Sequence, residues 1–356
     1  MDRRASRTVL LAGCSLHFLH DGLAELLYVL FPLWAREFSL PFVQVGLLRT
    51  GYSGALAAFQ VPAGFLAERF GEARLLIAGT LLTGLGFLGL GTAGSFAVLL
   101  LFLVAGGLGA GTQHPLASAL VSRAYEDGPR RMVLGTYNFS GDLGKTAWTA
   151  ATALLVAWVG WRWTMGGFGL VILLAALAAA LVLPRLASPP ARERGAAHGG
   201  WAGWGIKNRV GFAVLSTIHG IDNGSRTAFL TFLPFLLLEK GARIDLVGVA
   251  LGLTLAGGAV GKFVCGAVAE RLGVIRTVWV TEAVTGLGIL LLLRAPLWPA
   301  VLLLPVLGIA LNGTSSVLYG TVPDLVAPER RSRAYGLFYT VGIGSGALAP
   351  PAFGVI

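Results

Sequence analysis

Long apolar runs are the feature that most limits what this chain can fold into. A helix that crosses a bilayer needs roughly 20 mostly apolar residues. The sequence holds eleven such runs, at 8–34, 43–66, 75–93, 96–121, 132–158, 163–183, 210–238, 246–268, 277–293, 298–321 and 334–355. Because a bilayer core offers the backbone no hydrogen-bond partners, each run is expected to be an α-helix. The pattern predicts an all-α polytopic membrane protein.

The composition agrees with this prediction. Only 12% of the 356 residues are charged and 55% are hydrophobic, whereas soluble domains carry roughly 25% charged residues. The 51 glycines indicate closely packed membrane helices rather than flexible linkers. An ordinary soluble domain is therefore excluded.

The net charge of +10 reflects topology. With a cytoplasmic N-terminus, the cytoplasmic segments hold 18 of the 27 Lys and Arg residues, the opposite loops hold five, and four lie inside runs. This asymmetry follows the positive-inside rule. We therefore expect an integral inner (plasma) membrane protein with a cytoplasmic N-terminus and no nucleic-acid partner.

A repeat of 202 residues runs through the chain. GFLAERFG at 64–71 returns as GAVAERLG at 266–273, with five of eight positions identical. The same spacing aligns His17 with His219, and Gly111-Thr112 with Gly313-Thr314. Self-similarity at a fixed spacing indicates two homologous halves.

The repeat predicts two bundles. Six spans lie in residues 1–183, five lie in 210–356, and a Pro-, Gly- and Arg-rich cytoplasmic linker covers 184–209. The counterpart of the sixth span would begin near residue 362, beyond Ile356, so we expect the twelfth span to be missing by truncation. Paired bundles are a transporter architecture, with the binding site between the halves near the bilayer midplane.

Several motifs carry a resemblance to a known family. GFLAERFGEAR at 64–74 resembles the loop between spans two and three of the major facilitator superfamily, with Glu68 where aspartate is usual. HxxxD at His17–Asp21, FPLWAREFSL at 31–40 and GLGAGTQHP at 107–115 are similar to the fosmidomycin resistance branch of that superfamily. The resemblance implies a fold of two pseudo-symmetric helical bundles and secondary transport by alternating access.

The fifth span departs from that branch. GDLGKTAWTA at 141–150 carries Trp148 and Thr149 where a Gly-Pro pair is expected. It also carries Asp142 and Lys145 where small or neutral residues are expected. This suggests a changed substrate or a changed coupling ion.

Ionisable residues inside the runs need an explanation, since each costs roughly 2.5–3.5 kcal/mol or more at mid-membrane. His17, His20, Asp21 and Glu25 share one helical face in the first run. His219, Asp222 and Arg226 repeat this spacing in the seventh run. The fourth and fifth runs add His114, Asn138, Asp142 and Lys145, and the resemblance adds Asn312 and Ser315 to the central path.

These residues suggest two roles. We expect Asp21 to be the proton carrier, with Glu25 second and His17 or His114 as its modulator. Lys145 and Arg226 suit an anionic substrate group. The predicted substrate-binding set is His20, Asn138, Asp142, Lys145, His219, Asp222, Arg226, Asn312 and Ser315.

Structural roles stay open for some of these residues. Asp142 and Lys145 could neutralise each other, as could Asp222 with Arg226, and His17 with Asp21 could be a packing pair. Lys262 and Glu282 are expected at span ends or helix contacts, and no role is assigned to Arg49.

The repeated loop suggests a gate. By resemblance, its acidic, basic and glycine residues make hydrogen bonds that break and reform as the halves rock; the alternative is charge that only sets topology. The gating candidates are Gly64, Glu68, Arg69, Gly71, Arg74, Glu270, Arg271 and Arg276.

The sequence thus predicts a transporter rather than an enzyme, acting as a monomer without a cofactor or resident metal. Proton-coupled efflux of a drug-like or anionic small molecule leads, and uptake or exchange of an organic anion is the alternative. Divalent metal transport stays open as well, since His17, His20, Asp21 and His114 are plausible ligands. No HExxH pattern or membrane-embedded nucleophile supports an intramembrane hydrolase.

Overall fold

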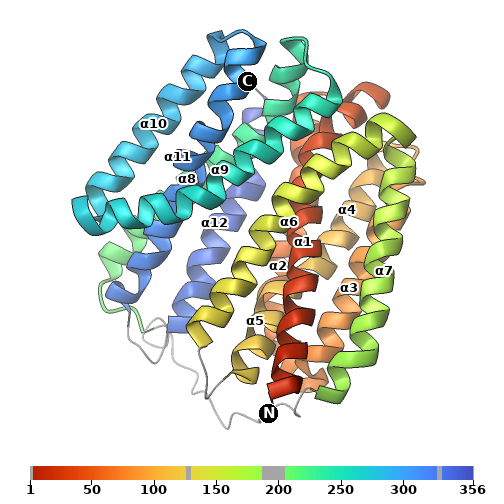
Figure 1. The fold of residues 1–356 in the computed structure, drawn as a ribbon, viewed down its shortest axis with the longest axis vertical. Helices are drawn as coiled ribbons and strands as arrows, with labels where there is room; N and C mark the ends of the chain where they lie inside the picture. Colours follow the sequence, from red (N-terminus) through yellow and green to blue (C-terminus); the bar gives the residue numbers. More distant parts are fainter. Residues whose placement is uncertain (1–2, 126–129, 187–204, 327–330, 356) are drawn as a thin grey trace.

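The computed structural model describes residues 3–125, 130–186, 205–326 and 331–355. Within these ranges the chain is helical and contains no named strand (Figure 1). The helices are α1 (Arg3–Glu37), α2 (Phe42–Phe70), α3 (Glu72–Leu90), α4 (Phe96–Ala110), α5 (Gln113–Ala124), α6 (Arg130–Val159), α7 (Trp161–Leu186), α8 (Arg209–Glu239), α9 (Ile244–Leu272), α10 (Val274–Arg294), α11 (Leu297–Leu325) and α12 (Arg331–Phe353).

The helices account for all eleven predicted runs. α4 and α5 follow each other within one span, Phe96–Val121. Seven spans in the described residues are long and apolar enough to cross a membrane by length and composition alone. The remaining long helices are α2, α6, α8 and α12. Two of them carry both an acidic and a basic residue within the span: Asp142 and Lys145 in α6, and Asp222 and Arg226 in α8. The all-α membrane fold predicted from the sequence is confirmed.

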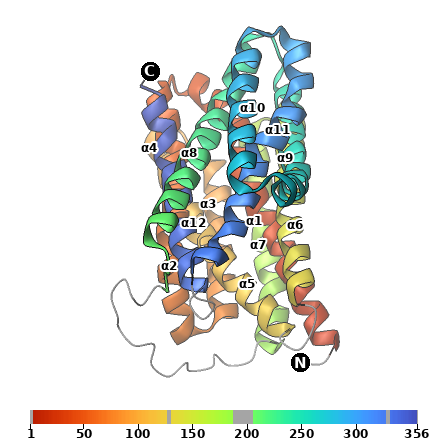
Figure 2. The same cartoon turned by 90° about the vertical axis from the view of Figure 1, so that its left-hand side faces the viewer.

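Helix packing follows the repeat. α1 packs on α6 in the first half, and the corresponding pair α8 and α12 packs in the second. The halves meet along two seams, α2 with α12 and α6 with α9. In Figures 1 and 2, α1 begins at one end of the molecule and α12 ends at the other, as expected for an odd number of spans.

The turn after α2 and the turn after α9 have the same backbone conformation. Gly71 has φ 87° and Gly273 has φ 81°, a region that side-chain-bearing residues rarely adopt. Their amides bond to the Ala67 and Ala269 carbonyls at 2.8 and 2.9 Å. The glycine that closes each copy of the repeated motif is thus required by the turn.

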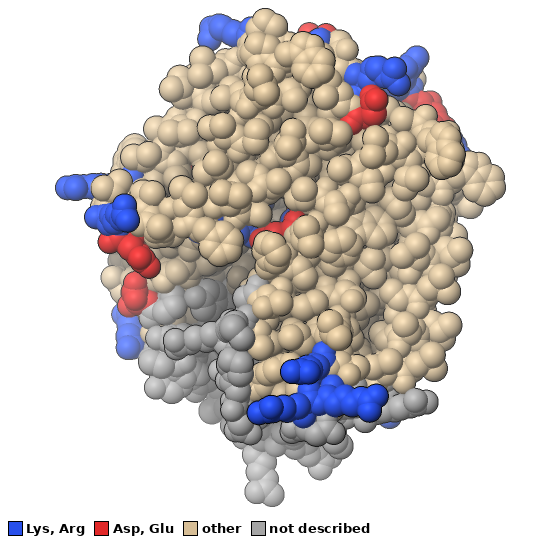
Figure 3. Space-filling model, viewed as in Figure 1, with Lys and Arg blue, Asp and Glu red and all other residues tan. Residues whose placement is uncertain are grey.

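The outer surface carries a broad belt of uncharged residues. Figure 3 shows charged side chains mostly at the top, at the bottom and on the left-hand edge of the view, with this belt between them. Trp158, Trp163, Trp279 and Trp298 are 84%, 80%, 74% and 65% exposed, and tryptophan is enriched at membrane interfaces. The surface therefore matches an integral membrane protein.

Candidate functional site

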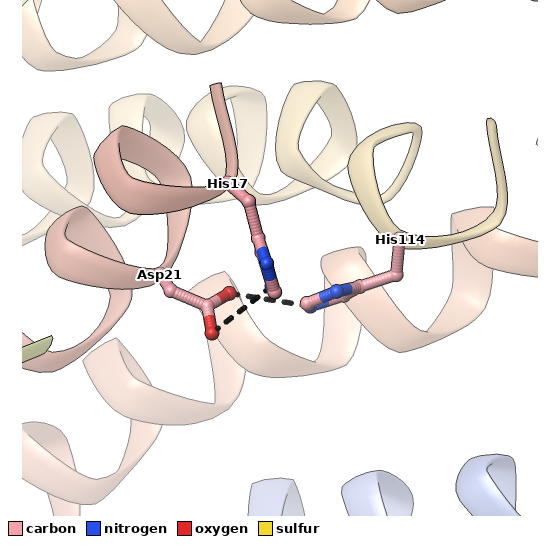
Figure 4. A group of neighbouring side chains, drawn as sticks. All are labelled: His17, Asp21 and His114. Atoms are coloured by element: carbon pink, nitrogen blue, oxygen red, sulfur yellow. Dashed lines mark ion pairs between the residues drawn. The ribbon is translucent and has the colours of Figure 1, made fainter. Parts of the chain in front are cut away.

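Asp21 is the centre of a buried polar cluster in the first half. His17 Nε2, on the same helix, lies 3.3 Å from Asp21 Oδ2. His114 of α5 lies 3.5 Å from Oδ1, and Lys145 of α6 lies 3.0 Å from Oδ2. Figure 4 shows the two imidazole rings converging on the carboxylate. Three helices thus bring their ionisable groups to one carboxylate.

The hydrogen bond of His17 Nδ1 determines how His17 Nε2 can interact with Asp21. His17 Nδ1 lies 2.8 Å from the Tyr137 carbonyl oxygen, and because a carbonyl only accepts, Nδ1 must carry the hydrogen. In a neutral ring Nε2 is then an acceptor, facing an Asp21 oxygen that is also an acceptor. The contact needs a proton, or another cation, between them. The ring also stacks on Tyr137, with centroids 4.1 Å apart.

Small residues let α6 approach α1 closely enough to form this cluster. A Cβ placed on Gly141 would lie 2.7 Å from Asp21 Oδ2, and one on Gly144 would lie 2.0 Å from the Phe18 carbonyl oxygen. Trp148, which departs from the branch pattern, lies over Gly22 of α1 and meets Phe168 edge-on at 4.4 Å. Glycine at these positions is the local reason that Asp21 and Lys145 meet.

A chain of ion pairs leads from Asp21 to the second half. Lys145 Nζ lies 3.4 Å from Asp142 Oδ1 on its own helix. Lys262 of α9 donates to both Asp142 oxygens, at 2.7 and 2.6 Å. Figure 3 shows a small patch of acidic and basic atoms within the belt, over the region where α6 and α9 cross in Figure 1. Asp142 is therefore shared by cations from both halves.

Lys262 was expected at a span end or a helix contact, and its pairing across the halves was missed. One cue was present in the sequence, because the 202-residue repeat aligns Lys262 with Gln60, which is also polar. The residue that Lys262 would meet was not readable from the sequence.

The cation of the second half has different partners. The Arg226 guanidinium donates to Asn312 Oδ1 at 3.0 Å and also to Asn223 Oδ1. Among the described residues Arg226 forms no ion pair with a carboxylate, although Asp222 and Glu25 act on it electrostatically. Its Nε has no hydrogen-bond partner. The local pairing of Asp222 with Arg226, left open above, is not formed, whereas that of Asp142 with Lys145 is.

Glu25 lies between the two clusters. The side chain is buried, and its Oε2 has no hydrogen-bond partner. It acts electrostatically on Lys145 in one half and on Arg226 in the other. Arg49, to which no role was assigned, donates to the Ala24 carbonyl at 2.6 Å and lies over the Tyr28 ring at 4.5 Å.

The other predicted substrate-binding residues are dispersed. His20 Nε2 lies 3.2 Å from the Thr80 hydroxyl of α3. His219 stacks on Phe338 at 4.4 Å, and Asn138 is exposed on α6. Ser315 donates to the Asn312 carbonyl at 2.7 Å. These residues do not form one cluster with Asp21.

The gating candidates lie at the ends of α2, α3, α9 and α10. The side chain of Glu68 lies outside the described residues. Arg69, Arg74, Glu270, Arg271 and Arg276 are exposed, and Gly64 has nothing within 4 Å of a Cβ placed on it. Beside the first turn, the Arg123 guanidinium of α5 donates to Glu72 of α3 at 2.5 Å, a pair that the sequence analysis did not anticipate.

Comparison with known proteins decides the family. The profile of the Major Facilitator Superfamily matches residues 13–350. This chain belongs to that superfamily. It is 25% identical to the fosmidomycin resistance protein of Escherichia coli over 346 residues, which cover 96% of this chain and 84% of the relative. It is 26% identical to the probable sulfoacetate transporter SauU of Cupriavidus necator over 350 residues, 91% of this chain and 81% of that one.

Solved structures of other transporters have a similar fold. A bacterial homolog of the human lysosomal transporter Spinster, in an inward-facing and occupied conformation, has a TM-score of 0.83 at 20% identity, covering 100% of this chain and 82% of that one. The nucleoside transporter NupG has a TM-score of 0.79 at 12% identity, with 98% and 90% covered. The predicted major facilitator fold is confirmed.

Proposed function

We propose that this member of the superfamily is a proton-coupled exporter of a small organic anion. The observation that carries the proposal is the ion-pair chain that joins a carboxylate of the first half to a cation of the second. Asp21 and Lys145 are 3.0 Å apart, and Asp142 lies between Lys145 and Lys262. The transport activity of the family is shared by this chain; its coupling and direction are our assignment.

The proposed coupling starts at Asp21. Proton binding removes the negative charge of Asp21, so Lys145 loses one of its two carboxylate partners. Lys145 then turns fully to Asp142 and competes there with Lys262. Weakening the pair between Asp142 and Lys262 loosens the α6–α9 seam, which lets the halves rock. Proton release restores the pair.

The proposed anion site is Arg226. A guanidinium held by two amide oxygens keeps its positive charge available, and its fork geometry suits a carboxylate, sulfonate or phosphonate. Lys145 is already occupied by two carboxylates, so we assign anion recognition to Arg226. The similarity to a probable sulfoacetate transporter supports an anionic substrate.

The remaining assignments follow from the topology. We place the N-terminus in the cytoplasm, because 18 Lys and Arg residues then lie in cytoplasmic segments and only five in the opposite loops. Residues 1–183 and 210–356 act as the two rocking bodies, and the chain works as a monomer.

The test is transport by purified protein in proteoliposomes, with sulfoacetate and fosmidomycin as probes. Asp21→Asn is expected to abolish movement driven by a proton gradient while leaving exchange of probe against probe measurable. Imposing the proton gradient in each direction in turn determines the direction of transport. Intact gradient-driven transport by Asp21→Asn would refute the coupling role of Asp21.

A further inference from the structure

His17, Asp21 and His114 place three metal-type ligand atoms together. One donor atom from each residue lies within 4.8 Å of the other two. His17 Nε2 lies 3.3 Å from Asp21 Oδ2, and His114 Nε2 lies 3.5 Å from Asp21 Oδ1. Donors held 2.0–2.2 Å from a tetrahedral zinc ion are about 3.3–3.6 Å apart. Each imidazole nitrogen thus lies at this spacing from one carboxylate oxygen, and a small movement of the side chains would bring the three donors onto one ion.

The outer contacts of the cluster also suit a metal. A metal-binding histidine commonly donates its other ring nitrogen to a carbonyl, which points the remaining lone pair at the ion. His17 does this through Nδ1 and the Tyr137 carbonyl, at 2.8 Å. Gly141 packs against the same ring, since a Cβ there would lie 2.6 Å from His17 Cε1. The His17 lone pair is thus fixed toward Asp21.

An ion can reach the cluster through His114. Its side chain is 39% exposed, whereas those of His17 and Asp21 are 5% and 9% exposed. Two imidazoles and one carboxylate favour zinc, cobalt or nickel over magnesium or calcium. They also leave a fourth position for water.

Lys145 opposes a metal ion at this place. Its ammonium lies 3.0 Å from Asp21 Oδ2 and 3.4 Å from Asp142. Asp142 can hold Lys145 when Asp21 binds a metal. The titratable groups that face or adjoin Asp21 are His17, His20 and Glu25 of α1, Tyr52 of α2, His114 of α5, and Tyr137, Asp142 and Lys145 of α6.

We propose that His17, Asp21 and His114 bind a divalent transition-metal ion of the zinc class, and that this ion excludes the coupling proton. The metal site stands on the geometry alone, and only its inhibitory consequence rests on the proposed function. Zinc would then inhibit proton-driven transport.

Binding of Zn²⁺, Co²⁺ and Mg²⁺ to tag-free protein in detergent at pH 7.5 tests the site. We expect Zn²⁺ to bind more tightly than Mg²⁺, and Co²⁺ to give an absorption spectrum of tetrahedral type. His17→Ala and His114→Ala should each weaken zinc binding about tenfold or more. The matched control His219→Ala removes a histidine of the other half and should leave zinc binding unchanged.

Lys145→Met supplies a test in the opposite direction. Removing the competing positive charge should tighten zinc binding at least about threefold. Zinc binding that is unchanged in both His17→Ala and His114→Ala, or no tighter than that of Mg²⁺, would overturn the metal site. Failure of the metal site leaves the effect of Asp21→Asn on proton-driven transport unchanged, so the two proposals can fail separately.

Discussion

His17 and His219 occupy equivalent positions of the repeat but have different partners. Each ring stacks on an aromatic ring of the helix packed against it, with an interplanar angle of 13°: His17 on Tyr137 and His219 on Phe338. His17 bonds through Nδ1 to a carbonyl and faces Asp21 through Nε2. Neither nitrogen of His219 has a hydrogen-bond partner. Equivalent stacked histidines thus take part in a polar network in one half and in an aromatic contact in the other.

The difference extends to the cations of the two halves. Lys145 lies between two carboxylates, whereas Arg226 is held by two neutral amides. Charges that are paired within the protein suit a role in coupling, because protonation changes their pairing. A charge without a direct carboxylate partner suits a ligand of opposite sign. We infer that duplication gave both halves the same helix packing, and that the cations of the two halves now have separate roles.

The largest expected effect is on anion binding, and it comes from removing Arg226, the cation of the second half. Arg226→Ala should weaken sulfoacetate binding by about 2–5 kcal/mol, because a half-buried guanidinium no longer meets the anion. Lys145→Ala should change this binding by less than about 1 kcal/mol. Isothermal titration measures both, and a nucleoside serves as an uncharged comparison ligand.

Arg226→Lys is the matched control for that comparison. It keeps the charge but loses the planar fork, so we expect a loss intermediate between wild type and Arg226→Ala. Equal losses for Arg226→Ala and Lys145→Ala would show that both halves recognise the anion and would remove the contrast.

A smaller effect, on stability, is expected from changes at the seam between α6 and α9. Asp142→Asn leaves Lys145 and Lys262 with weaker partners and should lower the free energy of unfolding by about 1–3 kcal/mol. A double-mutant cycle with Lys262→Met should give a coupling energy of about 0.5–3 kcal/mol. Chemical unfolding in detergent provides the measurement.

The equivalent position of Asp142 in the other seam supplies a control. The repeat places Gly344 of α12 there, and a Cβ on this residue meets nothing within 4 Å. Gly344→Ala should therefore be close to neutral for stability. A coupling energy near zero between Asp142 and Lys262 would mean that this ion pair does not hold the seam together.

The smallest effect is expected from the two histidines themselves. His219→Phe preserves the stack on Phe338 and should change the free energy of unfolding by less than about 1.5 kcal/mol. His17→Phe also preserves its stack but removes one donor from the Tyr137 carbonyl, which still accepts from the Ser140 hydroxyl, so we expect a loss of about 0.5–1.5 kcal/mol. Proton-driven transport should fall only in His17→Phe, and a matching fall in His219→Phe would contradict the division of roles.

Much of the fold was predictable because its determinants are local. Each apolar run must become a helix in a bilayer, so run lengths alone located the helices. The sequence also showed that His17 and Asp21 share a helical face and that Asp142 and Lys145 are one turn apart. Their pairing at 3.3 and 3.4 Å follows from that spacing.

The partners from other helices were not predictable. His20 shares the face of Asp21 by spacing, yet its Nε2 lies at Thr80 instead. Lys262 is 120 residues from Asp142, and its contact exists because α6 and α9 meet at the seam. Helix rotation and close approach determine such contacts, and both depend on packing against several helices at once.

The sequence by itself determined the membrane helices, the two related halves and the glycine that ends each copy of the repeated motif. These features depend on hydropathy and backbone sterics, which act over a few residues. Only the tertiary structure decided that Asp21 meets His114 and Lys145, and that Arg226 meets amides rather than a carboxylate. A direct ion pair needs its nitrogen and oxygen atoms within about 4 Å, so it is set by where the packed helices place each side chain.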